Sequence, residues 1–331
     1  MGSLAQGARN AVRVCMSVRK GEHVLIVSDK PRFEIGNAIK KEAEAVSPGN
    51  VEIYVLEDYC SRPMSDLPDK IATKIPWANV TFWATEAMKG EVTGRMQFLR
   101  TALKYARHGH MPNITRQIME DAMCADYNEV YRVTMKVNEA VKNTKRIKVT
   151  NPAGTNLEVE LNPQWRWKPS HGLFHKRGEW GNLPEGEIFT AAYKANGVLV
   201  VDLLGDFFDK KYGILTADPL RIKVKDSRAD IGGIQCNNQE LKKELQAYLK
   251  TDENSNRLGE TALGTNTFLK KLTGNLLQDE KFPTVHCAFG NPYPDETGAT
   301  WDSKTHVDCI MIDSNVWIDN KKIMEKGKYL L

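Results

Sequence analysis

The chain has 331 residues, of which 41% are hydrophobic and 27% charged, and its 46 basic and 42 acidic residues give a formal net charge of +4. This composition is that of a globular protein and excludes an intrinsically disordered chain. The near balance of charges does not indicate a nucleic-acid partner. The length favours two domains over one.

Cysteine usage and apolar runs bear on the compartment. The six cysteines are scattered, without a C-x-x-C pair or the dense spacing of a small disulfide-stapled fold. We therefore expect a reducing, cytoplasmic location. The longest apolar runs, such as His23–Val27 and Asn196–Leu204, are too short to span a bilayer. No membrane partner is expected.

The first part of the chain alternates strands with helices. Helical spacing is expected over residues 7–18, 33–46 and 94–107, and strand-forming runs occupy 22–28, 51–56 and 79–84. This alternation predicts a parallel sheet flanked by helices. The first strand ends in Ser28-Asp29-Lys30-Pro31 rather than in a glycine-rich phosphate loop, which disfavours dinucleotide binding. We expect residues 1–140 to form an α/β scaffold domain.

Strands dominate the rest of the chain. A helix over 127–141 is expected to lead into a hairpin over 146–161. Further strands are predicted at 186–192, 197–204, 220–225, 284–289, 305–312 and 316–318, and two helices at 238–249 and 267–272. The predicted fold class is α/β, with the parallel helix-flanked sheet domain followed by a β-rich α+β domain over residues 141–331.

The strand predicted at 305–312 carries a histidine and an aspartate two residues apart. His306 and Asp308 point to the same face because side chains alternate along a strand, with Cα atoms about 6.6 Å apart. The opposite face, Val307, Cys309 and Met311, is apolar and would pack on the core. Taken alone, such a pair is more often a hydrogen-bonded surface pair than a pair of metal ligands.

Three further residues of the same domain could complete a metal site. Taken singly, His286 in an apolar strand is more often a core histidine. Glu187 in a turn before a strand and Glu260 near a helix start could be surface carboxylates. Together with His306 and Asp308 they give two imidazoles and three carboxylates at strand ends or glycine turns. Such a donor set suits divalent ions. The sequence therefore predicts that 141–331 is a metal-binding catalytic domain.

Four segments resemble successive signatures of the aminopeptidase T family of metallopeptidases, the thermophilic aminopeptidase type. In the family's order they are NLPEGEIFT at 182–190, GETALGTN at 259–266, VHCAFG at 285–290 and THVD at 305–308. The resemblance extends over about residues 120–331 and is loose before them. The chain is shorter than typical members, notably between His286 and His306, where the active-site rim would lie.

The resemblance implies a ligand set and an activity. The family uses two glutamates, two histidines, an aspartate and a tyrosine seven residues after the first histidine, which here is Tyr293. The implied metal ligands are Glu187, Glu260, His286, Tyr293, His306 and Asp308. The implied activity is that of a metallo-aminopeptidase, a homodimeric hydrolase that removes N-terminal residues from peptides. The expected cofactors are two divalent ions, zinc, cobalt or manganese.

The roles that follow for the catalytic residues are hypotheses. Glu260 would bridge the two ions, and Glu187 would be a terminal ligand or the general base. Tyr293 would ligate or donate a hydrogen bond to the tetrahedral oxyanion. Tyr293 could instead be a packing residue between two prolines.

A dioxygenase is the alternative. The 2,5-dihydroxypyridine dioxygenases resemble these peptidases but use one non-haem Fe(II), and His286, His306 and Asp308 could supply the required two-histidine, one-carboxylate triad. The following residues could then hold an aromatic substrate, or could be loop and packing residues: His171, His175, Trp165, Trp167 and Trp180. A metal-binding protein without turnover is a third possibility, against which the complete ligand set argues.

Charge counting favours two ions over one. Glu187, Glu260 and Asp308 carry three negative charges, and a hydroxide shared by two ions would add a fourth. Two divalent ions balance four charges, whereas a single iron would leave two glutamates uncompensated. Uncompensated buried carboxylates are costly.

Overall fold

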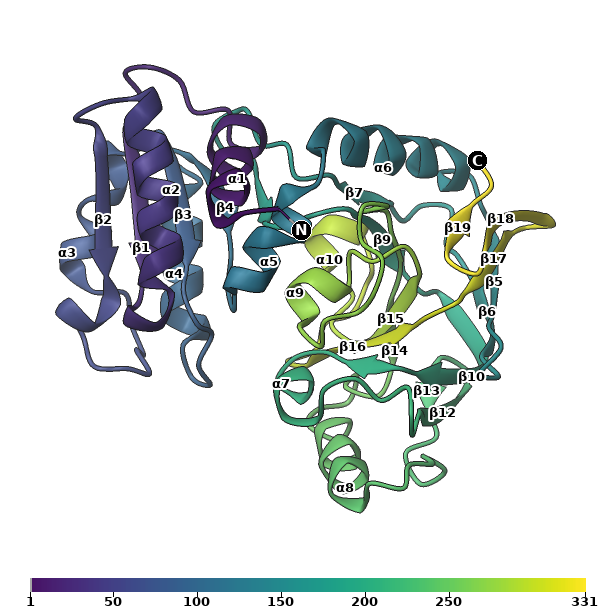
Figure 1. Cartoon of the computed structure of the whole chain (residues 1–331). Helices are drawn as coiled ribbons and strands as arrows, with labels where there is room; N and C mark the ends of the chain where they lie inside the picture. Colours follow the sequence, from purple (N-terminus) through teal and green to yellow (C-terminus); the bar gives the residue numbers. More distant parts are fainter. Residues whose placement is uncertain (1) are drawn as a thin grey trace. The chain divides into compact units, whose positions relative to one another are not determined.

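The computed structural model describes residues 2–331 and divides into two compact units (Figure 1). One unit comprises the chain up to Tyr131 together with His171–Glu185, and the other comprises Arg132–Ser170 together with Gly186–Leu331. The boundary falls inside helix α6 (Tyr127–Val141) rather than near residue 140. The sequence predicted one unbroken segment for each domain and did not predict that residues 171–185 belong to the first unit.

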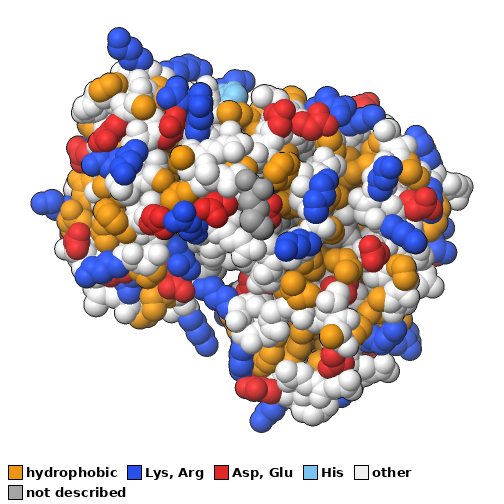
Figure 2. Space-filling model, in the orientation of Figure 1, with side chains coloured by type: hydrophobic (Ala, Val, Ile, Leu, Met, Phe, Trp, Pro, Cys, Tyr) orange, Lys and Arg blue, Asp and Glu red, His pale blue; other side chains and the backbone are white. Residues whose placement is uncertain are grey.

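The surface carries mixed charge. On the face shown in Figure 2, basic and acidic side chains are interspersed, in keeping with the small net charge of +4. Within residues 2–331, each helix is too short or too polar to cross a membrane.

The first unit contains a parallel five-stranded sheet with helices on both faces. The strands, in spatial order, are β2 (Val51–Val55), β1 (Val24–Ser28), β3 (Val80–Ala84), β4 (Arg107–His110) and β8 (Trp180–Asn182). All four pairings are parallel. In Figure 1, α2 (Phe33–Val46) lies in front of these strands and α4 (Val92–Ala102) behind them. The predicted parallel, helix-flanked sheet is confirmed.

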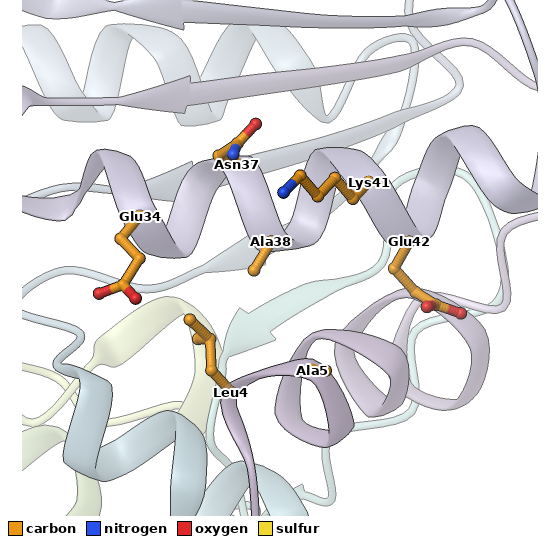
Figure 3. A pocket seen from close by; sticks show the side chains of 7 residues that line it. All are labelled: Leu4, Ala5, Glu34, Asn37, Ala38, Lys41 and Glu42. Atoms are coloured by element: carbon orange, nitrogen blue, oxygen red, sulfur yellow. The ribbon is translucent and has the colours of Figure 1, made fainter.

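The remaining helices of this unit are short: α1 (Leu4–Arg9), α3 (Asp69–Ala72) and α5 (Arg116–Glu120). A surface hollow of about 380 Å³ lies between α1 and α2 (Figure 3). Its polar lining consists of Glu34, Asn37, Lys41 and Glu42. Its lining contains no histidine or cysteine, so it offers no imidazole or thiolate ligand to a metal ion.

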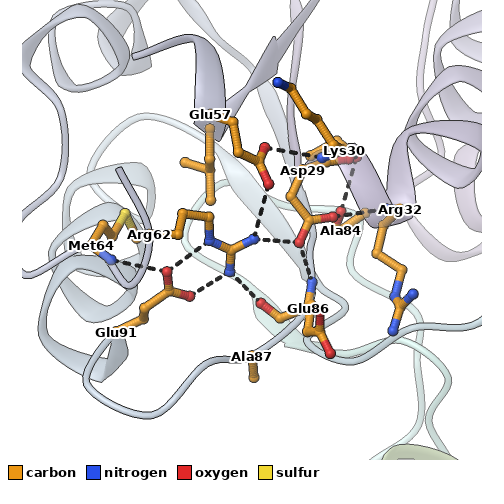
Figure 4. A network of polar contacts seen from close by, with 12 residues as sticks. Asp29, Lys30, Arg32, Glu57, Arg62, Met64, Ala84, Glu86, Ala87 and Glu91 are labelled. Atoms are coloured by element: carbon orange, nitrogen blue, oxygen red, sulfur yellow. Dashed lines mark hydrogen bonds and ion pairs between the residues drawn. The ribbon is translucent and has the colours of Figure 1, made fainter. Parts of the chain in front are cut away.

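An ion-pair network fills the carboxyl end of the parallel sheet (Figure 4). Asp29, which directly follows β1, pairs with Arg62, and Arg62 Nε donates to Glu91 Oε1 at 2.7 Å. The side chains of all three are at most 6% exposed. Open parallel sheets bind ligands at this edge, where the strand order reverses, here between β1 and β3. The protein's own guanidinium occupies that place, which fits a scaffold role for the unit.

Loss of this guanidinium should destabilise the first unit strongly. Arg62→Met leaves Asp29 and Glu91 buried without their cation, and breaking a buried pair in this way costs about 3–5 kcal/mol. Urea unfolding followed by circular dichroism would measure the loss. Arg116→Met is the matched control, because Arg116 also pairs with two carboxylates, Glu34 and Glu120, but on the surface. Equal urea midpoints for Arg62→Met and Arg116→Met would contradict the inference that burial makes the loss of Arg62 costly.

Two histidines are buried in β4, which the sequence did not predict as a strand. Thr81 Oγ1 lies 2.8 Å from His108 Nδ1, and His108 Nε2 lies 3.0 Å from His110 Nδ1. Burial lowers the pKa of His108 to about 3 and that of His110 well below its usual value. The hydrogen bonds explain how the polar run Arg107-His-Gly-His110 can form an interior strand.

This burial makes the first unit sensitive to acid. An unfolded histidine has a pKa near 6.5, so the folded state binds fewer protons. The stability contribution is complete above about pH 6.5 and is lost as the pH falls from there toward 3. His108→Gln should therefore flatten the fall of unfolding free energy between pH 6 and 4, by up to about 1.4 kcal/mol per pH unit. Urea titrations at several pH values test this. An equal flattening of the pH dependence in the control variant His23→Gln would contradict the assignment of the acid sensitivity to His108.

The second unit is built from two antiparallel sheets. The larger, in spatial order, contains β13 (Arg228–Ala229), β12 (Leu220–Lys225), β10 (Lys194–Val201), β6 (Asn156–Glu160), β5 (Arg146–Thr150), β17 (Asn315–Ile318), β18 (Lys321–Glu325) and β19 (Lys328–Tyr329). The smaller contains β11 (Leu203–Leu204), β16 (His306–Met311), β15 (Val285–Gly290), β14 (Leu258–Gly264), β9 (Glu187–Ala191) and β7 (Lys168–Ser170).

The two sheets share one hydrophobic core. The larger sheet contributes residues such as Val149 and Leu199, and the smaller contributes Cys287 and Cys309 from neighbouring strands. Because side chains alternate along a strand, each strand of the smaller sheet presents its other residues on the face away from this core. That second face carries Glu260 and Asp308, which the sequence predicts as metal ligands. The short helices of the unit are α7 (Phe208–Tyr212), α8 (Gln239–Tyr248), α9 (Leu276–Asp279) and α10 (Pro294–Thr297).

Two local predictions in this unit are wrong. Residues 267–272 form no helix, because the chain turns there and Asp279 accepts hydrogen bonds from the backbone N–H groups of Thr273 and Gly274. Helix α9 begins only at Leu276. Glu260 lies inside strand β14, between β15 and β9, and not near a helix start. Because a strand pairs with β14 on each side, the side chain of Glu260 is buried.

Candidate metal centre

The predicted site residues lie on the outer face of the six-stranded sheet. The register places Glu260 opposite Ala288, and Ala288 opposite Asp308, across three adjacent strands. His286 is two residues before Ala288 on β15, and His306 is two residues before Asp308 on β16. The neighbours Cys287 and Cys309 point to the core. The predicted alternation of β16 is confirmed.

A β-bulge directs Glu260 to this face. Leu258 pairs with Phe289, and Glu260 already pairs with Ala288, so β14 has one extra residue at Gly259. Without the bulge, Glu260 would share the core face of Leu258, since residues two apart point the same way. A side chain at position 259 is excluded because its Cβ would lie 2.4 Å from the carbonyl oxygen of Gly290. The glycine before Glu260 is thus required for the site.

Five of the six predicted ligands converge. His286 Nε2 lies 3.2 Å from Glu187 Oε2 and 3.4 Å from Glu260 Oε1. His306 Nε2 lies 3.4 Å from Asp308 Oδ1 and 3.7 Å from Glu260 Oε2. Ligand atoms of Glu260, His286 and Asp308 all lie within 4.8 Å of one another. The side chains are buried except that of His306, which is 19% exposed.

The donor set fits a divalent metal ion. His306 Nδ1 lies 2.9 Å from the carbonyl oxygen of Asn291 and must donate to it, which leaves Nε2 free to act as a ligand. Glu260 Oε2 is buried and accepts no hydrogen bond within residues 2–331. Such an oxygen is costly to bury unless a cation approaches it. Imidazole nitrogens and carboxylate oxygens together suit zinc, manganese, cobalt or iron.

The electrostatics of the cluster favour positive charge between its carboxylates. Burial alone would lower the pKa of His306, but the charges of Asp308 and Glu260 outweigh it and raise that pKa to about 10. The pKa of His286 is likewise raised, with Glu187 and Glu260 outweighing burial. Burial raises the pKa of Glu260, against the effect of both imidazoles. The carboxylates therefore create a strong negative potential where the two imidazoles meet.

Tyr293 lies at the edge of the site. Its ring is 4.7 Å from that of His306 and 5.7 Å from that of Phe189, centroid to centroid. The residue is 41% exposed and has φ 52°, a left-handed conformation that is uncommon outside glycine. Burial of the phenol group and the charges of Glu260 and Asp308 raise the pKa of Tyr293 well above its usual value. Its hydroxyl is therefore a hydrogen-bond donor at neutral pH.

The sequence did not point to Lys281, which contacts the cluster, or to Glu280, which pairs with Lys281. Lys281 is completely buried, and its Nζ lies 2.6 Å from Glu187 Oε1 and 2.7 Å from Glu280 Oε1. In the sequence, Asp279-Glu280-Lys281 reads as an ordinary solvated charge run. It carries no motif or periodicity that would place it in the interior.

The aromatic and histidine residues that could hold an aromatic substrate have other neighbours. In the first unit, His175 Nε2 contacts the carbonyl oxygen of Val14 at 2.9 Å, and His171 packs against Tyr131. Trp180 packs edge-on against His110. In the second unit, the ring of Trp165 lies 5.4 Å from that of Trp301 in a tilted arrangement, and Trp167 packs against the core. These contacts are those of packing residues.

The class of this protein follows from sequence comparison: it is a metallopeptidase, since the profile of the family described as thermophilic metalloprotease (M29) matches residues 73–329. The chain belongs to the thermophilic metalloprotease (M29) family. This membership confirms the resemblance in the four signature segments. No curated protein sequence matches the chain.

Solved structures show the same fold. Wild-type AmpT from Thermus thermophilus superposes with a TM-score of 0.74 at 16% identity, covering 99% of both chains. The 2,5-dihydroxypyridine dioxygenase from Pseudomonas putida KT2440 gives a TM-score of 0.71 at 14% identity, covering 99% of this chain and 96% of that one. At these identities the likeness establishes the fold and not the reaction.

Proposed function

We propose that this chain is a metal-dependent aminopeptidase that hydrolyses the first peptide bond of a peptide. The observation that carries the proposal is the convergence of Glu187, Glu260, His286, His306 and Asp308 on one buried sheet face in a member of a metalloprotease family. A divalent ion supplies Lewis acidity there and makes water acidic enough to serve as the nucleophile near neutral pH.

The protein's own groups have distinct tasks in this proposal. Glu260, His286, His306 and Asp308 hold the metal, and Glu187 is a further ligand or the base that accepts the water proton. The Tyr293 hydroxyl, protonated at neutral pH, would donate a hydrogen bond to the developing oxyanion or join the ligands. A carboxylate of the cluster or the metal would receive the free amine of the substrate, which restricts cleavage to N-terminal residues.

The number of ions separates two forms of this centre. The charge count of Glu187, Glu260 and Asp308 favours the form with two divalent ions, in which Glu260 would be the bridge. One ion is the alternative, and single-zinc sites also activate water. The identity of the metal, zinc, cobalt or manganese, is not distinguished by a mixed nitrogen and oxygen donor set.

The proposal is tested with small chromogenic substrates. Purified protein loaded with Zn²⁺ or Co²⁺ should release p-nitroaniline from aminoacyl-p-nitroanilides and should not act on their N-acetylated forms. Removal of the metal by a chelator should abolish the activity, and its return should restore it. Cleavage of the acetylated substrate at the same rate would exclude an aminopeptidase.

A ring-cleaving dioxygenase is the second candidate. It is supported by the shared fold with the Pseudomonas enzyme and by the fact that His286, His306 and Asp308 alone can form the triad for one Fe(II). The two candidates differ in what they consume. Oxygen uptake on 2,5-dihydroxypyridine by iron-loaded protein, with no release of p-nitroaniline, would replace the peptidase proposal.

The proposal also includes the substrate class, the cellular location and the oligomeric state. A peptide substrate, a cytoplasmic location and a homodimer are expected from the family resemblance and from the six cysteines. All six are unpaired thiols, which is consistent with a reducing compartment. Sedimentation analysis would test the homodimer.

A further inference from the structure

Arg257 carries a guanidinium group that no carboxylate of the chain neutralises. The group lies over the indole ring of Trp301, with Cζ 3.5 Å from the ring centroid. Within residues 2–331 it forms neither an ion pair nor a side-chain hydrogen bond, and only the backbone groups of Arg257 are bonded, to Asn254 and Gly290. The stack on Trp301 therefore holds the guanidinium in place but leaves its charge unbalanced.

This stack lies beside the sheet face of the metal centre. Trp301 belongs to a small buried cluster that includes Ala191. Ala191 pairs directly with Glu260 across β9 and β14, so the two side chains share one face of the sheet. The carbonyl oxygen of Arg257 accepts a hydrogen bond of 2.8 Å from Gly290, the last residue of β15. Both the ring under Arg257 and its backbone thus connect it to strands that carry the predicted ligands.

The surroundings of Arg257 favour an anion. The neighbouring Arg228 forms a β-bridge with it. Nη1 of Arg228 donates at 2.7 Å to two neutral oxygens, the carbonyl of Glu253 and the side chain of Asn256. Burial and the charge of Arg228 lower the pKa of Arg257. The indole Nε1 of Trp301 is buried and has no acceptor within the described residues. The stack therefore presents donors and positive charge, which suit a carboxylate.

We infer that Arg257, stacked on Trp301, binds a carboxylate of the substrate peptide. The inference rests on the proposed aminopeptidase function and names its substrate class: short peptides with a free C-terminal carboxylate, or peptides with an acidic second residue. Along β14 the Cα atom of Arg257 lies about 10 Å from that of Glu260. Each residue of an extended peptide spans about 3.5 Å, so two or three residues are long enough to reach from the metal centre to the guanidinium.

Matched dipeptides test the inference. The full-length, metal-loaded protein is given leucylglycine and leucylglycine amide, which differ in the terminal carboxylate, and the released leucine is measured by chromatography. A hydrogen bond to a charged group changes affinity by about 10-fold or more. We therefore expect KM to be about 10-fold lower for the acid than for the amide, with similar kcat. Leucylaspartate α-amide separates the two sources of the carboxylate, because a low KM for it would assign the site to an acidic second residue.

Three variants show whether Arg257 is responsible. Arg257→Met keeps an unbranched chain over Trp301 and removes the charge, so it should raise KM for the acid to that of the amide. Arg257→Lys restores a charge without the planar fork and should recover part of the preference. Arg221→Met is the matched control, because Arg221 on β12 of the larger sheet also donates only to a neutral oxygen, the carbonyl of Ala153 at 2.7 Å. It should leave both KM values unchanged.

Binding without turnover separates this inference from the peptidase reaction. N-acetyl-leucylglycine and its amide, which an aminopeptidase does not cleave, are titrated into the wild type and into Arg257→Met by calorimetry. Tighter binding of the acid by the wild type alone supports the inference even if no peptide is hydrolysed, a result that would reject only the proposed reaction. Equal binding of acid and amide by the wild type would overturn the inference. So would an Arg257→Met protein that retains the preference for the acid, or one that loses kcat equally on both dipeptides, as a purely structural role predicts.

Discussion

Replacement of Glu260 by glutamine should abolish hydrolysis and release the metal. The carboxylate of Glu260 lies beside both imidazoles, with its oxygens 3.4 Å from His286 Nε2 and 3.7 Å from His306 Nε2. The amide keeps the size of the side chain but removes its charge. Loss of an outer-shell partner already lowers metal affinity by about 10- to 100-fold, so loss of this ligand should cost at least about 100-fold. Metal titration by calorimetry and p-nitroanilide hydrolysis measure the two effects.

A carboxylate elsewhere in the same unit provides the comparison. Glu158→Gln changes an exposed glutamate of β6 that pairs with Lys148. It should leave metal affinity and turnover unchanged. Near-normal turnover in Glu260→Gln would remove Glu260 from the site, whatever the behaviour of the control.

The sequence predicted the parts of the fold that depend on periodicity. Helix α2 and helix α6 have the bounds that helical spacing indicated, 33–46 and 127–141. The alternation of His306 and Asp308 with an apolar face is that of β16. In each case one face of a regular element is buried, and such elements have a pattern that is visible in a single sequence.

The parts that the sequence missed depend on contacts between distant segments. Strand β4 is polar in sequence and is buried only because His108 finds Thr81 and His110 as partners. Glu260 faces the site only through the bulge at Gly259, which a regular alternation would not predict. Lys281 looks like a surface residue until the fold brings Glu187 within 2.6 Å of it, 94 residues away in the chain.

Ala288 offers a second test of the centre, because it changes the available space and no ligand. It is completely buried, and it lies directly between Glu260 and Asp308 in the register of three adjacent strands. Facing Cβ atoms on neighbouring antiparallel strands are about 4.5–5.5 Å apart. In Ala288→Leu, three additional carbon atoms would therefore enter the space where the ligand atoms converge. Metal retention and hydrolysis should both be lost.

The loss must be separated from simple overpacking, which itself costs about 1–3 kcal/mol. Cys287→Leu is suited to this purpose because it enlarges the preceding residue of the same strand, whose side chain points into the core between the two sheets. Both variants should lose stability, but only Ala288→Leu should lose its metal. Wild-type metal content in a folded Ala288→Leu protein would mean that the ion is not held between Glu260 and Asp308. Loss of metal from both variants would mean that the site responds to general strain in β15 and not to the occupied space.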